Sequence, residues 1–435
     1  MTATATSTPN VLAAPFDQAT RAEVEALLAH WHANRVAETK QAATQLVARL
    51  PQYYFGWKML GVVLHRQGEL EAAAEAMAQA VAAHPDDMVT RYNLGCMLWS
   101  CNRFTLAQAH CGVILQRQPA QAEAWSLSGM IHASLQEDAA ARHAFTRALA
   151  LDANQLPALE GLGHILMAAG ELPAAADYFR QALGQRLLQP LKPARGEGAR
   201  ESFDQAPHQA LLWLTLAQLA RAGVKAFPFA GTLLGLHREG RLLPLDKDLD
   251  FALPFAQMEQ ACACLVAQGW TEEPLRMRLC NPRSFRHAGT GVVLDLCGLK
   301  PDGERLVGGF WQQDQRWDWQ RVTEFPAPLA LHEVMGPEGV YWALDQPDLW
   351  LSALYANWRL PEPDFDTVIS AHNLRGFSLL TECFALNRIN QSWSDGSWPK
   401  VLSLLTHSLR QLPDDELLLS ARRQVQQHLA SFTAG

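Results

Sequence analysis

The first half of the chain repeats one pattern of small and large apolar residues every 34 positions. Each unit contains a glycine, an alanine twelve positions after it, and a larger residue sixteen positions after it. Small residues let two helices approach closely, and a larger side chain fills the space beside them. The pattern therefore predicts a stack of helix pairs. The glycines are Gly61, Gly95, Gly129 and Gly163, and the larger residues are Met77, Cys111, Phe145 and Phe179.

This pattern resembles the tetratricopeptide repeat (TPR), whose period is also 34 residues. We expect a TPR solenoid over residues 20–189, after a disordered N-terminus over 1–19. Its repeats lie near 54–87, 88–121, 122–155 and 156–189, with a degenerate unit before them. The resemblance implies a concave groove that binds a protein partner. The alternative is that the array only supports the neighbouring domain or mediates self-association.

The second half alternates between helical and strand-like patterns. Residues 190–203 concentrate proline, glycine and charge, which is typical of a linker. The segment 204–397 mixes amphipathic helices with short strand-like runs and predicts a mixed α/β domain. Residues 398–435 have the pattern of amphipathic helices. The predicted fold class is thus an α-solenoid followed by a mixed α/β domain.

One predicted strand carries carboxylates at every second position. In the stretch LPLDKDLDFALPF (243–255), Asp246, Asp248 and Asp250 alternate with apolar residues. Residues two apart share a face of a strand, so these carboxylates would project together while Leu249 and Phe251 face the core. Carboxylates that close raise the pKa of at least one of them. Exposure of the strand end to water would relieve the repulsion, and so would a shared cation such as Mg²⁺.

Two neighbouring segments favour a bound cation over exposure to water as the explanation for the clustered aspartates. Gly231 and Thr232 occupy a strand-to-helix turn, where free N–H groups can hold a phosphate; an ordinary capped turn is the simpler alternative. Asp295 stands alone in the apolar run 291–299, and an unpaired buried carboxylate is unfavourable. This order of features is typical of nucleotidyltransferases. It predicts Mg²⁺ or Mn²⁺ held by Asp248, Asp250 and Asp295.

The stretch GTLLGLHREGRLLPLDKDLDF (231–251) resembles the signature of the LicD/fukutin family, and DQPDLWLSALYANWRLPEPDFD (345–366) is similar to the family's C-terminal stretch. The resemblance covers roughly residues 210–375. It implies a nucleotidyltransferase-like fold and a metal-dependent transfer of a phospho-alcohol, such as phosphocholine or a polyol phosphate. The donor would be CDP-linked, and the acceptor a hydroxyl of a glycan or glycosylated protein. The chain has Leu245 where the family has tryptophan, and Ala356 where it has glycine.

The predicted roles follow from these assignments. Asp246 would be a further metal ligand or would accept the proton of the acceptor hydroxyl. Arg238 matches the family arginine and would pair with phosphate or with an aspartate; a solvent-facing arginine is the alternative. Contacts to the phosphate are predicted for Gly231 and Thr232. Arg286 or His287 would face the donor; an ordinary solvated basic hairpin is the alternative.

Composition and charge limit the other functional classes. The net charge of −8 gives no general attraction to nucleic acid, so no nucleic-acid partner is expected. No apolar run approaches the ~18 residues of a membrane-spanning helix, and we expect a cytoplasmic protein without a transmembrane segment. Two rival functions remain open. One is a nucleotidyltransferase that places NMP on a small molecule or protein, and the other is a non-catalytic TPR scaffold.

Overall fold

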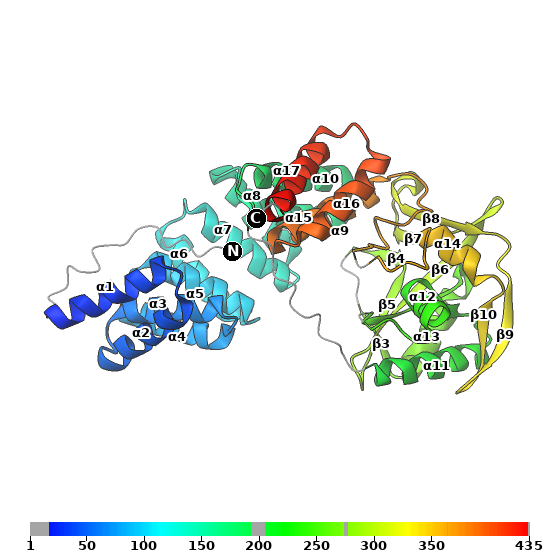
Figure 1. Cartoon of the computed structure of the whole chain (residues 1–435), viewed down its shortest axis with the longest axis horizontal. Coiled ribbons are helices and arrows are strands. Elements are labelled where there is room, and N and C mark those ends of the chain that lie inside the picture. Colours follow the sequence, from blue (N-terminus) through cyan, green and yellow to red (C-terminus); the bar gives the residue numbers. More distant parts are fainter. Residues whose placement is uncertain (1–16, 193–204, 245, 274–276, 363, 434–435) are drawn as a thin grey trace. The chain divides into compact units, whose positions relative to one another are not determined.

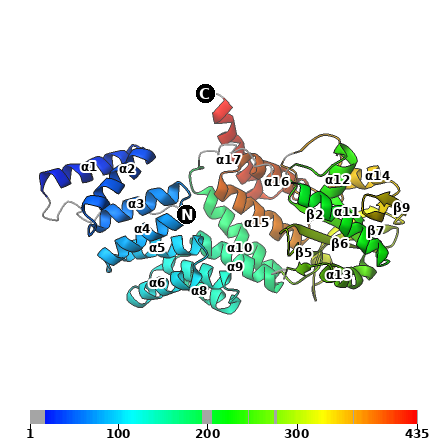
Figure 2. The same cartoon turned by 90° about the horizontal axis from the view of Figure 1, so that it is seen from below.

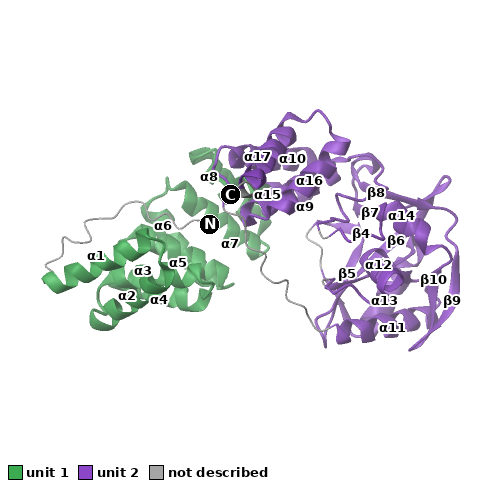
Figure 3. Ribbon diagram, in the orientation of Figure 1, with its two compact units in different colours: residues 1–162 green, residues 163–435 purple. Residues whose placement is uncertain are grey.

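The computed structural model describes residues 17–192, 205–244, 246–273, 277–362 and 364–433. The chain divides into two compact units, residues 1–162 and 163–435 (Figure 3). Most of the expected disordered N-terminus, most of the expected linker, and Leu245 lie outside the described residues.

The first unit is built from helix pairs, as the 34-residue period predicts (Figure 1). Gly129 shows why the period demands glycine: a Cβ atom there would lie 2.4 Å from the ring of Phe145. That ring is 1% exposed and closely packed, so it could not move away to make space for a Cβ atom. The N-terminal helical solenoid is therefore confirmed. Its helices are α1 (Gln18–His32), α2 (Val36–Arg49), α3 (Tyr54–Arg66), α4 (Leu70–Ala83), α5 (Met88–Ser100), α6 (Phe104–Arg117), α7 (Ala122–Ser134), α8 (Asp138–Leu151) and the start of α9 (Leu156–Ala169).

The second unit contains further helices that pack on one another although they are far apart in sequence. Helix α10 (Leu172–Leu187) packs against α15 (Leu379–Asp395), as Figure 2 shows. Arg180 of α10 donates a hydrogen bond to Glu382 of α15 at 2.8 Å. Helix α15 also packs on α16 (Trp398–Gln411), and α16 on α17 (Glu416–Thr433). We expected α15 to fall inside the domain 204–397, but these contacts join it to the helices on either side of that domain.

Between α10 and α15 the chain forms a mixed sheet with the strand order β1-β2-β6-β5-β3. Strands β2 and β6 are parallel, and the other pairs in this order are antiparallel. Strand β7 continues from β6 and pairs with β4 and β8. The strands are β1 (Phe227–Pro228), β2 (Asp248–Pro254), β3 (Trp270–Glu272), β4 (Leu279–Asn281), β5 (Arg283–His287), β6 (Val293–Asp302), β7 (Arg305–Gln312) and β8 (Arg321–Pro326). The mixed, sheet-containing C-terminal part is therefore confirmed.

One face of this sheet is the hydrophobic core of the domain. Leu249 and Phe251 of β2 and Phe285 of β5 are fully buried there. They pack with α11 (Ala206–Arg221) and α13 (Met258–Ala267). The alternation of β2 thus sends its apolar side chains toward α11 and α13, as predicted, and leaves its carboxylates on the other face.

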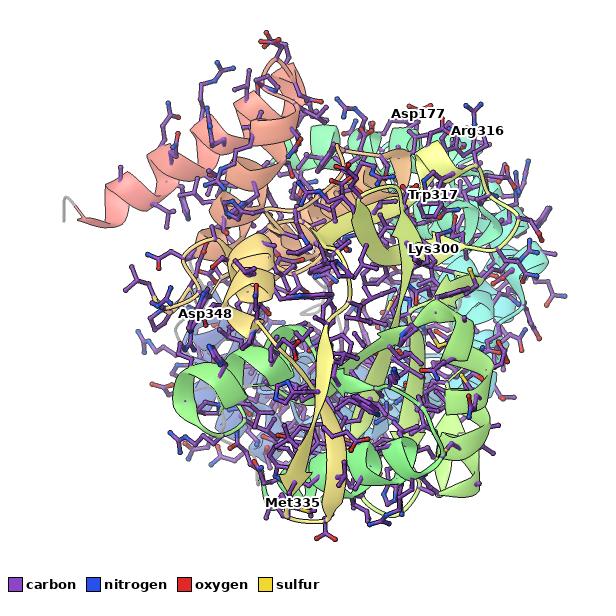
Figure 4. The ribbon with its side chains drawn as sticks, turned by 90° about the vertical axis from the view of Figure 1, so that its right-hand side faces the viewer. Asp177, Lys300, Arg316, Trp317, Met335 and Asp348 are labelled. Carbon is purple, nitrogen blue, oxygen red and sulfur yellow. The ribbon has the colours of Figure 1, made fainter. Side chains whose placement is uncertain are left out.

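The remaining elements lie at the periphery of the sheet. They are α12 (Ala230–Glu239), the hairpin of β9 (Leu331–Gly336) and β10 (Gly339–Leu344), and α14 (Pro347–Tyr355). Figure 4 shows Met335 near the tip of the hairpin and Asp348 on α14. In the same view Lys300 lies beside Trp317, with its ammonium group 4.0 Å from the ring centroid. In the described parts of the chain, no helix has the length and apolar character needed to cross a membrane.

Candidate functional site

The parallel pairing of β2 and β6 brings two of the predicted carboxylates together. Asp250 of β2 is the register partner of Asp295 of β6, and Asp295 is the partner of Ser284 on the antiparallel strand β5. Partners in register point to the same face, so the three side chains form a row across three strands. Within the row, the Ser284 hydroxyl donates a hydrogen bond to a carboxylate oxygen of Asp295. Asp248 belongs to the next row, on the same face of β2.

Asp246 joins the cluster from outside the strand. We expected it to lie on the same strand as Asp248 and Asp250, but β2 begins only at Asp248. The Asp246 carboxylate instead lies against the backbone of α12. A Cβ atom on Gly231 would lie 2.1 Å from Oδ2 of Asp246 and 3.2 Å from Oδ2 of Asp250. Both carboxylates therefore converge on one glycine, and any larger residue there would displace them.

The first turn of α12 holds Asp250 directly. The backbone N–H of Gly231 donates to Oδ2 of Asp250 at 3.1 Å. Ala230, which begins the helix, has a φ of +41°, in the left-handed region that residues with a Cβ atom rarely adopt. The helix N-terminus is thus occupied by a carboxylate of the protein in this structure.

Thr232 has a different role from the predicted one. Its side chain is fully buried, and its hydroxyl accepts a hydrogen bond from the backbone N–H of Asp250 at 2.8 Å. A phosphate could not reach this hydroxyl without opening the core. Thr232 therefore fixes β2 against α12 and positions Asp250, and the predicted phosphate contact through its hydroxyl is not supported.

The electrostatics of the cluster are unfavourable for four negative charges. Burial raises the pKa of Asp246 to about 6, and the neighbouring charge of Asp248 adds to this shift. Burial raises the pKa of Asp250 well above its usual value, with further contributions from Asp246, Asp295 and Asp248. The pKa of Asp295 is also raised, mainly by burial, and that of Asp248 is raised by partial desolvation although Asp248 is the exposed member of the four. The described residues provide none of the four with an ion-pair partner at bonding distance.

Strand alternation separates the two predicted basic residues of β5. Arg286 is two residues from Ser284 and shares the face of the carboxylates, where its charge lowers the pKa of Asp248 against the effect of burial. Its guanidinium is bound to Glu273 at 2.5 Å and 3.2 Å and to the carbonyl of Gly291 at 2.9 Å. His287 points to the opposite face, because adjacent residues of a strand alternate. There its ring packs on Trp270, 5.1 Å between centroids, so a donor contact from His287 at the aspartates is not supported.

Arg238 also lies apart from the carboxylates. It donates to the carbonyl of Trp358 at 3.2 Å and to Glu239 at 3.0 Å. Its charge is close enough to lower the pKa of Tyr355, which burial and the charges of Asp250 and Asp246 raise well above the usual value. Arg238 therefore borders the site through Tyr355, without an ion pair to an aspartate.

Three residues near the cluster were missed by sequence reasoning. Tyr355 ends α14 and faces Asp250 and Asp246 closely enough for their charges to raise its pKa. His208 of α11 binds the carbonyl of Lys247 at 3.0 Å and lowers the pKa of Asp248. Cys297 shares the face of Asp295, and its pKa is raised by burial and by Asp250 and Asp295. Cys297 could have been found from the period of two along β6, and Tyr355 from the 345–366 stretch. His208 carries no local signal.

The donor set of the cluster suits a hard cation, because it consists of carboxylate oxygens. The side chains are not arranged as a finished metal centre. Within the described residues, no group of three or more histidine, cysteine, aspartate or glutamate side chains could hold a metal ion as it stands. The fit to Mg²⁺ or Mn²⁺ therefore rests on the type and charge of the donors.

Comparison with known proteins identifies the repeats. Residues 122–155 match the family described as tetratricopeptide repeat. The N-terminal region carries tetratricopeptide repeats. No curated protein matched the chain.

Similar solved structures cover about two fifths of the chain. MamA 41-end from Desulfovibrio magneticus RS-1 is 16% identical, with a TM-score of 0.37, over 40% of this chain and 98% of that one. A tetratricopeptide repeat protein from Parabacteroides merdae ATCC 43184 is 17% identical, with a TM-score of 0.36, over 39% of this chain and 67% of that one. YrrB, described as a TPR protein with an unusual peptide-binding site, is 15% identical, with a TM-score of 0.33, over 38% of this chain and 84% of that one.

Proposed function

We propose that the sheet domain is a metal-dependent transferase of the nucleotidyltransferase type, and that the TPR array recruits its acceptor or a protein partner. The donor would be a nucleotide-linked compound such as a CDP-alcohol, and the acceptor a hydroxyl of a glycan or a protein. The observation that carries the transferase is the carboxylate cluster. Asp250 and Asp295 stand in register on parallel strands, Asp246 and Asp248 flank them, and all four pKa values are raised.

A divalent cation would remove the conflict between these charges. Asp248, Asp250 and Asp295 would hold Mg²⁺ or Mn²⁺, with Asp246 as a further candidate ligand. When bound, the cation would neutralise the charge of a pyrophosphate donor and of its leaving group. The nature of the donor alcohol rests on the resemblance of residues 231–251 to the LicD/fukutin signature.

The protein's own residues would orient and shield this site. Thr232 and Gly231 keep Asp250 in place through the bonds at 2.8 Å and 3.1 Å. Ser284 orients Asp295. Arg286, on the same face as the carboxylates, would be drawn toward an anionic donor, although it would first have to loosen its bonds to Glu273. Asp246, with its pKa of about 6, is suited to accept a proton near neutral pH.

The experiment is a metal and turnover assay on the full chain. Mg²⁺ binding is measured by calorimetry, and products are followed with CDP-alcohols and with NTPs. Release of CMP from a CDP-alcohol supports the phospho-alcohol transferase, and release of pyrophosphate from an NTP supports the nucleotidyltransferase. Asp248→Ala and Asp250→Ala should each abolish metal-dependent turnover. Asp314→Asn, an exposed aspartate in a weak pair with Arg278 at 3.4 Å, serves as the matched control. Full turnover in a folded Asp250→Ala variant would refute the assignment.

The second candidate is a non-catalytic TPR scaffold. The family match at 122–155 favours it, because tetratricopeptide repeats bind partners and carry no chemistry of their own. In that case the wild-type protein would bind neither Mg²⁺ nor nucleotide in the calorimetric assay. Metal binding that is lost on Asp250→Ala would count against this candidate.

A further inference from the structure

A charged cavity lies in the helical part of the second unit, and none of the clustered aspartates lines it. It has a volume of about 340 Å³, at the lower end of the range for small-molecule sites. Helix α15 supplies one wall with side chains spaced three or four residues apart, which share one side of the helix. The polar residues that line the cavity are Asp366, Asn387, Arg388, Gln391, Ser392 and Lys400.

The charges around this cavity do not balance. Asp366 is the acidic residue among its lining residues, whereas Arg388 and Lys400 are both basic. The Asp366 carboxylate is 4% exposed and accepts a hydrogen bond from Arg388, with the Lys400 ammonium 3.5 Å away. One carboxylate therefore faces two cations at the cavity wall.

A third cation lies behind the wall. Arg321 of β8 is 3% exposed, and it donates to the carbonyls of Val368 at 2.7 Å and Thr367 at 2.6 Å. Burial lowers the pKa of Arg321 to about 9, the Asp366 charge opposes that shift, and the Arg388 charge adds to it. Three cations thus share the field of Asp366, and the excess positive charge is partly desolvated. Such an excess of positive charge attracts an anion, and the attraction is greater where the cations are shielded from water.

The hydrogen-bonding groups at the cavity suit a tetrahedral oxyanion. Arg388 uses one terminal nitrogen for Asp366 and has 37% of its side chain exposed, so the rest of its guanidinium fork can reach a ligand. Gln391 is exposed, and Ser392 is half-buried beside it. The ammonium of Lys400 donates to the carbonyls of Asp364 at 3.0 Å and Phe365 at 3.3 Å and lies 3.5 Å from Asp366, so Lys400 contributes mainly its positive charge to the cavity. Side chains with several types of hydrogen-bond donor therefore line one small cavity.

We infer that this cavity binds the phosphate group of a small phosphorylated ligand, held by Arg388, Lys400, Gln391 and Ser392. The volume exceeds that of a phosphate ion alone, which leaves room for an attached organic part. The site is independent of the transferase proposal, because none of the four clustered aspartates lines it. It gives the second unit a positively charged ligand site in addition to its negatively charged cluster.

The test is titration of the full chain with inorganic phosphate in a chloride buffer containing EDTA, followed by calorimetry and by thermal unfolding. Without divalent metal the aspartate cluster repels phosphate, so binding reports on the cavity. Gln391→Glu introduces a negative charge at an exposed position without breaking the Arg388–Asp366 pair. It should weaken phosphate binding at least tenfold. Arg388→Gln should also weaken it, and comparison of the two separates loss of binding from loss of folding.

Two controls complete the design. Arg423→Gln removes a positive charge from α17, outside the residues that line the cavity, and should bind phosphate like the wild-type protein. Asp250→Asn should also retain phosphate binding, which separates this site from the carboxylate cluster. The inference is overturned if the wild-type protein does not bind phosphate, or if the folded Gln391→Glu variant binds it with unchanged affinity.

Discussion

Replacing Asp246 by asparagine should make the metal-free protein more stable at alkaline pH. The carboxylate is half-buried, lies against Gly231, and has its pKa raised from 3.8 to about 6. Ionisation is therefore less favourable in the folded protein than in the unfolded chain. One pKa unit corresponds to 1.36 kcal/mol, so the shift of about two units destabilises the folded state by roughly 3 kcal/mol above pH 6. Asp246→Asn keeps the shape of the side chain and removes this charge.

The sign and the pH range of the effect follow from the two pKa values. Well below pH 3.8 the carboxyl group is protonated in both states, and the substitution gains nothing. As the pH rises from 3.8 to about 6, the unfolded chain ionises first and the folded state loses relative stability. The gain from Asp246→Asn should thus be about 1 kcal/mol at pH 4.5 and approach about 3 kcal/mol at pH 8.

Urea denaturation in EDTA, followed by tryptophan fluorescence at pH 4.5 and pH 8, measures the effect. Asp314→Asn is the control, because its carboxylate is 74% exposed and should give no pH-dependent gain. Addition of Mg²⁺ should reduce the advantage of the Asn variant, since a cation stabilises the wild-type cluster; at 100 times its Kd this amounts to about 2.7 kcal/mol. The reasoning is refuted if Asp246→Asn destabilises the protein at pH 8, or if its gain is the same at both pH values.

Three further predictions follow from other contacts. Gly231→Ala should destabilise the second unit by about 1–3 kcal/mol, because the new Cβ atom would lie 2.1 Å from the Asp246 carboxylate. The same clash should weaken Mg²⁺ binding in calorimetry, and an unchanged metal affinity would contradict this prediction. Ala356→Gly should stabilise the protein by about 1 kcal/mol in urea denaturation, because Ala356 has a φ of +55° with a ψ of −90°; no gain would show that the backbone is not strained there. Phe145→Ala should lower the free energy of unfolding of the first unit by about 3–5 kcal/mol, because the ring is 1% exposed and fills the space beside Gly129 and Gly161. Unfolding is monitored by circular dichroism. A loss below about 1 kcal/mol would refute the packing role of the ring.

The parts of the fold that were predicted correctly are those with a periodic pattern. A period of 34 residues repeats the same helix crossing, so Gly129 and Phe145 reveal their contact in the sequence itself. A period of two along β2 likewise separates Leu249 and Phe251 from Asp248 and Asp250. By contrast, nothing local indicates that α15 packs on α10, because that contact joins residues about 200 positions apart, such as Arg180 and Glu382.

Three side chains at the site are placed differently from the expectation, each for a local structural reason. Asp246 continues the alternation of the aspartates, but strand β2 begins only at Asp248. The carboxylate of Asp246 therefore belongs to the segment before the strand. Thr232 is polar and follows a glycine, but its hydroxyl bonds the backbone of Asp250 inside the core. His287 adjoins Arg286, and this adjacency places it on the opposite face of β5. In each case the direction of the side chain depended on the tertiary structure, which the local sequence does not determine.

The energetic state of the cluster bears on the choice between a transferase and a scaffold. A protein-binding role of the repeats gives no physical reason to bury Asp250 beside Asp246 and Asp295, because ionising them together destabilises the fold. A cation-binding role supplies that reason, since the same repulsion becomes binding energy when a divalent ion enters. The stability of the wild-type protein should therefore fall with rising pH in EDTA and recover on addition of Mg²⁺, and this recovery should be absent in Asp250→Asn. A scaffold whose carboxylates are only solvated would show the same pH dependence with and without the metal.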